Sequence, residues 1–160
     1  MKALALLAVL SAYTLSDPAI TEPPQAGDTG IKWNLDYLEK TWGLKAKSIT
    51  IPPAPAKSTA NLETFKLVLE FTKDIDDLKT LKAALEPNPS KGQPITLYFY
   101  YFDEENVSLG KTYVRSVEGE ITGKKGDAIR VYVDVINAPQ LAKTKKIEAR
   151  PVDMPSPDKK

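Results

Sequence analysis

The chain has 160 residues with 22 basic and 21 acidic side chains, so its net charge at pH 7 is only +1. It contains no cysteine and no histidine. This composition excludes disulfides, thiolate nucleophiles, cysteine or histidine zinc sites and histidine-dependent catalytic triads. The near-neutral charge also argues against general binding to nucleic acid, which requires a net basic surface.

The first 16 residues have the layout of a secretory signal peptide. Lys2 precedes an unbroken apolar run over 3–10, and small or polar residues follow. A helix over 3–15 would rise about 20 Å, too short for a hydrocarbon core of roughly 30 Å. We therefore expect a secreted or periplasmic protein without a stable membrane anchor; the alternative is an N-terminal strand or core helix. Residues 17–30, rich in Pro, Gly, Thr and Asp, are expected to form a flexible linker.

Residues 31–150 are expected to form one β-sandwich domain that begins with a short helix. The apolar residues of its first segment share one helical face: Ile31, Leu35, Leu38 and Trp42. The rival prediction is a strand, because apolar side chains in the same segment also alternate with polar ones, at Trp33, Leu35 and Tyr37.

Alternation of apolar and polar side chains predicts the strands that follow. It is clearest over 64–72, 95–102 and 129–135, and weaker over 47–51, 112–122 and 144–149, the last expected to be a lysine-rich edge strand. Helical spacing over 74–85 predicts one helix inserted between strands. Eight apolar residues on the alternating faces are expected to form one core: Phe65, Leu67, Leu69, Phe71, Leu97, Phe99, Val131 and Val133.

About six strands without regular intervening helices predict a mainly β fold. The arrangement that fits best is an antiparallel immunoglobulin-like β-sandwich with one or two short helices. Residues 151–160 are rich in proline and charge and are expected to form a disordered tail.

One short segment, Phe99-Tyr100-Tyr101-Phe102-Asp103, resembles the signature of FxLyD-type domains, which are small extracytoplasmic β-sandwiches. Phe99 and Asp103 match the signature, whereas Tyr101 stands where leucine is expected. Leu109 and Gly126 also lie where that family places such residues. The resemblance covers about a quarter of the chain, and the helix over 74–85 departs from the family pattern. It implies a sandwich fold, an envelope location and no catalytic residues.

The acidic clusters are assigned to local structure rather than to chemistry. The group Asp74, Asp76 and Asp77 lacks the glycine and the glutamate of a calcium-binding loop and suits a helix N-terminus. The adjacent acids at 103–105 suit a turn better than the paired carboxylates of a glycosidase. We therefore expect no metal, no cofactor and no catalytic residue, and we predict that the protein is not an enzyme. The sequence Asn106-Val107-Ser108 is an N-glycosylation sequon.

Three tyrosines on the polar sides of their strands are the candidate ligand-binding residues: Tyr98, Tyr100 and Tyr132. If their strands are neighbours, the rings would form an exposed platform, of the kind that stacks sugars or binds partner surfaces. The reading that we prefer is that the N-terminal helix covers them, because its apolar stripe must be buried.

The main functional hypothesis is an exported, non-catalytic β-sandwich with a structural or protein-interaction role. Its partner would be a protein in the cell envelope or outside the cell, and no nucleic acid is expected. The alternative is a carbohydrate- or small-ligand-binding module that uses an exposed tyrosine face.

The leader generates a first prediction. The charged residue, the apolar run and the small residues that follow it place the start of the mature chain between Tyr13 and Ile20. N-terminal sequencing of the exported protein tests this. A cytoplasmic product that retains Met1 would contradict both the leader and the predicted location.

Overall fold

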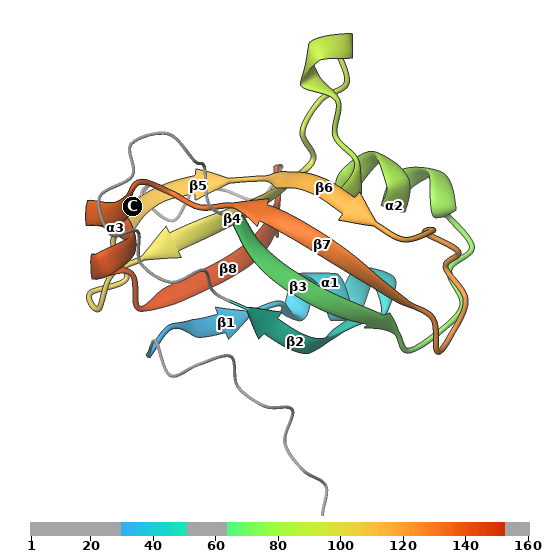
Figure 1. Ribbon diagram of the computed structural model, residues 1–160, viewed down its shortest axis with the longest axis horizontal. Coiled ribbons are helices and arrows are strands. Elements are labelled where there is room, and N and C mark those ends of the chain that lie inside the picture. The colour runs from blue at the N-terminus through green and yellow to red at the C-terminus, as the bar shows by residue number, and fades with distance from the viewer. Residues whose placement is uncertain (1–29, 51–63, 153–160) are drawn as a thin grey trace, which may run out of the picture.

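The computed structural model describes residues 30–50 and 64–152, and these form two sheets of four strands (Figure 1). The predicted signal peptide, all but the last residue of the predicted linker and the tail after 152 lie outside the described residues. Sheet A has the order β1 (Lys32–Asn34), β8 (Lys146–Pro151), β4 (Leu97–Phe102) and β5 (Ser108–Thr112). Sheet B has the order β2 (Leu44–Thr50), β3 (Thr64–Phe71), β7 (Ala128–Asp134) and β6 (Val114–Glu118). The predicted mainly β sandwich is confirmed.

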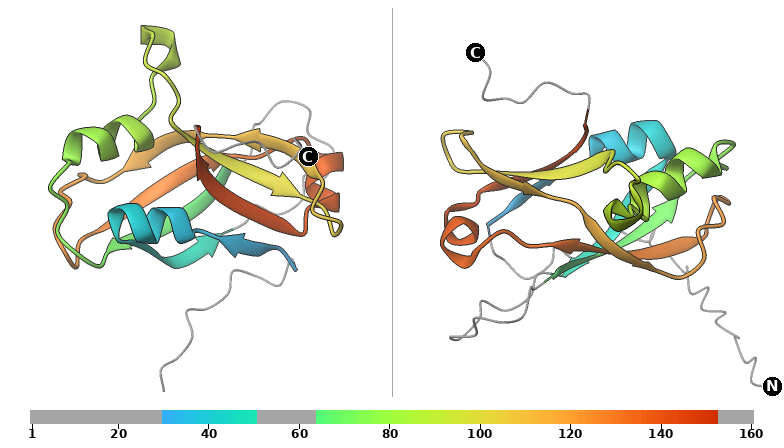
Figure 2. Two further views of the ribbon diagram at one scale, coloured as in Figure 1. Left: turned by 180° about the vertical axis from the view of Figure 1, so that it is seen from behind. Right: turned by 90° about the horizontal axis from the view of Figure 1, so that it is seen from above.

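Short helices lie around the two sheets. They are α1 (Asp36–Trp42), α2 (Leu78–Leu85) and α3 (Ala138–Lys143), together with a 3-10 turn, η1 (Pro89–Lys91). α2 and α3 lie at opposite ends of the sandwich, and η1 protrudes from its body (Figures 1 and 2). None of the helices in 30–50 and 64–152 is long and apolar enough to cross a membrane.

The N-terminal segment combines both structures that its sequence pattern allows. Residues 32–34 form β1, and the helix occupies only 36–42, ended by Gly43 in the left-handed conformation at φ 58°. Gly43 suits this position because it carries no Cβ. α1 connects an edge strand of sheet A to an edge strand of sheet B and contacts β2 and β8. Leu38 and Trp42 thereby enter the core between the sheets.

β8 is an interior strand, so the prediction of an edge strand over 144–149 is wrong. It pairs antiparallel with β4 on one side and parallel with β1 on the other. The prediction failed because the strand that covers the edge of β8 is β1. β1 has only three residues, and its alternation of apolar and polar side chains runs directly into the helical stripe that follows. The expected strand over 112–122 is observed as β6, and two further strands, β1 and β5, raise the number of described strands from about six to eight.

The core contains all eight residues that alternation predicted, each of them inaccessible to solvent. One polar group of the core is the hydroxyl of Tyr101, which reaches from sheet A to sheet B. This hydroxyl donates to the carbonyl of Asp134 over 2.8 Å, so the hydroxyl of Thr112, 3.0 Å away, must donate to it. The ring of Tyr101 stacks on Phe65 of sheet B with centroids 6.2 Å apart. Burial raises the pKa of the Tyr101 phenol, which therefore remains a neutral donor.

α2 begins later than its spacing suggested. Asp77 is its N-cap and accepts from the backbone N–H of Thr80 over 3.0 Å and from the Thr80 hydroxyl over 2.6 Å. Asp74 accepts instead from the backbone N–H of Lys125, over 2.8 Å, and so ties the segment before the helix to the β6–β7 connection. The buried face of α2 consists of Leu81, Ala84 and Leu85.

We predict that Tyr101→Phe lowers the free energy of unfolding by about 1–3 kcal/mol, because it leaves the Asp134 carbonyl and the Thr112 hydroxyl without their buried partner. Chemical denaturation measures the change. Tyr98→Phe is the matched control, since it removes a hydroxyl from the half-buried outer side of the same strand. Equal stability changes in the two variants would contradict a special role for the buried hydroxyl.

Candidate functional site

The outer face of sheet A carries a row of three aromatic side chains on β4: Tyr98, Tyr100 and Phe102. We call it the aromatic row. The alternate residues of the same strand, Leu97, Phe99 and Tyr101, belong to the core, so strand geometry points the row away from it. Tyr100 lies 6.3 Å from Tyr98 and 6.5 Å from Phe102, measured between ring centroids. The row is therefore continuous along the strand.

Cations from the two neighbouring strands lie over the rings. Lys111 of β5 places its Nζ 4.1 Å from the centroid of Tyr98. Lys146 of β8 places its Nζ 4.5 Å from the centroid of Phe102, and the Arg150 guanidinium carbon lies 5.5 Å from the same ring. These distances are within the range of cation–π attraction.

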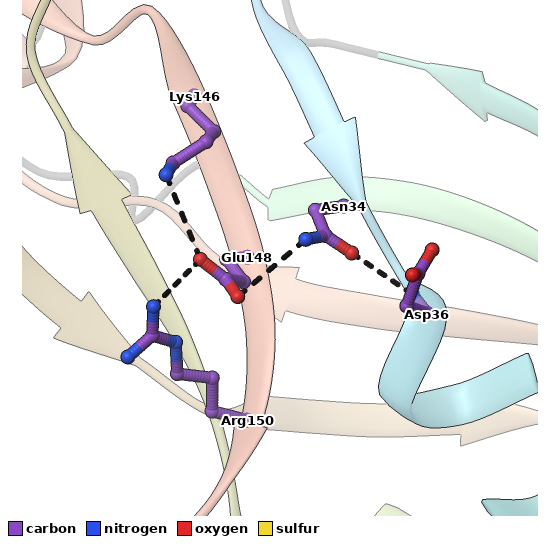
Figure 3. A network of polar contacts seen from close by, with 5 residues as sticks. All are labelled: Asn34, Asp36, Lys146, Glu148 and Arg150. Carbon is purple, nitrogen blue, oxygen red and sulfur yellow. Dashed lines mark hydrogen bonds and ion pairs between the residues drawn. The ribbon is translucent and has the colours of Figure 1, made fainter. Parts of the chain in front are cut away.

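Glu148 lies among these cations and holds two of them (Figure 3). Its Oε2 accepts from Nη2 of Arg150 over 2.8 Å and lies 3.7 Å from Nζ of Lys146. Its Oε1 accepts from the side-chain amide of Asn34 on β1 over 3.5 Å. Because Asn34 also accepts from the backbone N–H of Asp36 over 3.1 Å, the network extends to the start of α1. The carboxylate thus fixes the positions of both cations above the row.

The cations cover most of the aromatic row. Only 7 % of Tyr100 and 1 % of Phe102 are exposed, while Tyr98 is half-buried. The expectation that the N-terminal helix covers these rings is wrong, because the apolar side of α1 is in the core. Trp33 on β1 also points inward, where its ring meets Phe65 edge-on at 5.0 Å. The cations that lie over the rings come from β5 and β8 of sheet A itself.

Tyr132 does not join the other two tyrosines. It lies on β7 of sheet B between the core residues Val131 and Val133, and therefore faces outward from the opposite layer. Its hydroxyl donates to Glu118 over 2.7 Å, and Arg130 donates to the other oxygen of that carboxylate over 2.8 Å. The single platform of three tyrosines is therefore not formed.

The remaining polar clusters serve local structure. Oδ1 of Asp103 accepts from the backbone N–H groups of Glu105 and Val107 and so closes the turn between β4 and β5. Asn106 in the same turn has φ 61°, a left-handed conformation that asparagine tolerates. Within 30–50 and 64–152, no three acidic side chains come close enough together to hold a metal ion.

The tyrosines could be predicted from alternation, but the cations and Glu148 could not. Phe102 continues the period of Tyr98 and Tyr100, so its place in the row was visible in the sequence. The charged residues of β8, Lys146, Glu148 and Arg150, also alternate, but they lie about 48 residues away from the row. Only the register between β8 and β4, which pairs them with Phe102, Tyr100 and Tyr98, reveals the site.

Comparisons with known proteins return no match: no family model, curated protein or solved structure resembles the chain closely enough to be assigned.

The outer face of sheet B generates a prediction about Glu118. The hydrogen bond from Tyr132 and the attraction of Arg130 hold the pKa of the Glu118 carboxyl below its usual value. Since the pKa is lowered in the folded state, its contribution to stability is present at neutral pH and is lost as pH falls through that pKa. Tyr132→Phe should raise the pKa of Glu118 in a carboxyl NMR titration, whereas Tyr98→Phe should leave it unchanged. An unaltered titration in Tyr132→Phe would show that the hydrogen bond does not set it.

Proposed function

We propose that this protein is an exported, non-catalytic binding module, and that the outer face of sheet A binds a protein partner in the cell envelope or outside the cell. The observation that carries the proposal is the aromatic row with its cations. Tyrosine, phenylalanine and arginine are the residue types enriched where protein surfaces meet. The outer face of sheet B has no such row, and each of its outward carboxylates pairs with a cation: Glu70 with Lys47, Asp134 with Arg115 and Glu118 with Arg130.

The cations that lie over the ring faces favour a protein over a neutral sugar as the ligand. A sugar stacks on the open face of an aromatic ring. Here Lys111, Lys146 and Arg150 already lie over the ring faces, and Phe102 is almost fully covered. Charged groups directed outward from an aromatic base can instead meet opposite charges on a protein surface. The carbohydrate-binding alternative is the weaker proposal for this reason.

The strand order supports an immunoglobulin-like module, the class in which FxLyD-type domains also belong. Sheet B has the order β2-β3-β7-β6, which corresponds to strands A, B, E and D of an immunoglobulin domain, and β5-β4-β8 corresponds to C′, C and F. β1 lies beside β8 where the last strand, G, would lie, but runs parallel to it. This architecture is common among cell-surface proteins, in agreement with the export that the leader predicts.

Site-specific photocrosslinking tests the proposal. In one variant p-benzoylphenylalanine replaces Tyr98, which preserves a ring in the aromatic row and all the cations around it. In the matched variant it replaces Tyr132, which also faces outward but on sheet B. Irradiation of cells that produce the full chain should give a crosslinked protein only from position 98. No protein adduct from position 98, or an adduct only from position 132, would refute the proposed surface.

A further inference from the structure

We infer that the partner contributes a carboxylate-rich, extended peptide segment that crosses sheet A over the aromatic row. This inference rests on the proposed function and specifies the chemistry of the partner. It follows from an excess of positive charge on this face and from the position of the single carboxylate among the cations.

Four cations and one carboxylate point outward from sheet A. Lys111, Lys146 and Arg150 lie over the row, and Lys32 of β1 is in register with Lys146 on the same side of the sheet. Glu148 opposes them, which gives the face a net charge of +3 in a chain whose total is +1. Among the described residues, neither Lys32 nor Lys111 forms an ion pair. An anionic partner therefore complements this face electrostatically.

The cations extend across the whole sheet. Lys111 is on β5, at one edge, and Lys32 is on β1, at the other, with Lys146 and Arg150 on β8 between them. Three interstrand spacings of about 4.8 Å separate the two edges, roughly 14 Å in all. An extended peptide rises about 3.3 Å per residue, so a segment of about five residues spans the face. A single carboxylate would reach only part of it.

Glu148 has the position that a carboxylate of the partner would take. It already accepts from Arg150 and lies beside Lys146 above the row. An incoming carboxylate that approaches these cations is repelled by Glu148 and competes with it for the same donors. Neutralising Glu148 should therefore strengthen binding, whereas neutralising a cation should weaken it. If the cations served only to stabilise sheet A, the face would bind no anionic peptide, whether Glu148 or a cation was neutralised.

A short oligoglutamate peptide is the probe, titrated into the full chain and followed by amide NMR shifts. We expect shifts confined to β1, β4, β5 and β8 and an affinity that falls as salt is added. Lys111→Gln should weaken binding by about two- to fivefold, and Glu148→Gln should tighten it by a similar factor, the size expected for single exposed charge pairs. Lys66→Gln, which removes a cation from the outer face of sheet B, is the matched control and should change little.

Absence of binding, or shifts centred on β3 and β7, would overturn the inference, as would weaker binding in Glu148→Gln when its spectrum shows an intact fold. An acidic oligosaccharide that binds more tightly than the peptide would replace the peptide partner with a polysaccharide. A crosslinked protein at position 98 together with no oligoglutamate binding would refute the acidic segment and leave the proposed function standing.

Discussion

The buried hydroxyl of Tyr101 is the constraint on which the described architecture depends. A phenol placed between two apolar sheets must find partners, because an unsatisfied buried hydroxyl costs free energy. It finds them at Asp134, the last residue of β7, and at Thr112, the last residue of β5. One residue, Tyr113, separates β5 from β6, so this is where the chain passes from sheet A to sheet B. The hydrogen bonds thus fix the sheets to each other at their crossover.

The inward direction of Tyr101 determines what lies outside. Because successive side chains of a strand point to opposite faces, Tyr100 and Phe102 must point outward, where apolar rings would be exposed to water. β8 supplies part of the cover: Lys146 is opposite Phe102 and lies over its ring, and the guanidinium of Arg150 lies over Tyr100 and Phe102. Lys111 of β5 lies over Tyr98. Long cationic side chains can shield a ring with their stems and bind its face with their charge. The surface chemistry of sheet A is therefore a consequence of how its core is packed.

Alternation within a strand could be read from the sequence, whereas pairing between strands could not. The core faces of β3, β4 and β7 were predicted residue by residue because one strand contains all the information needed. For Tyr132 the outward direction was predicted from alternation, but the sequence left open whether its strand lies beside that of Tyr98 and Tyr100. Strand order depends on which distant segments pair. The sequence separation between Lys146 and Phe102 is no different from that between Phe102 and many residues that it does not contact. β1 was predicted only as the rival to a helix, because three residues are too few to establish a period.

The cations over the aromatic row affect both the solubility of this surface and what it can bind. Three uncovered aromatic rings in line would form an exposed apolar patch, which favours aggregation as well as recognition. Cations over the rings remove that hazard while Glu148 keeps Arg150 and Lys146 above them. In the proposed function this arrangement would make the surface selective, because a partner would have to offer negative charge to engage it, and a purely apolar partner would meet cations before it met the rings. Glu148 sets the strength of that requirement, since it satisfies part of the positive charge in the free protein.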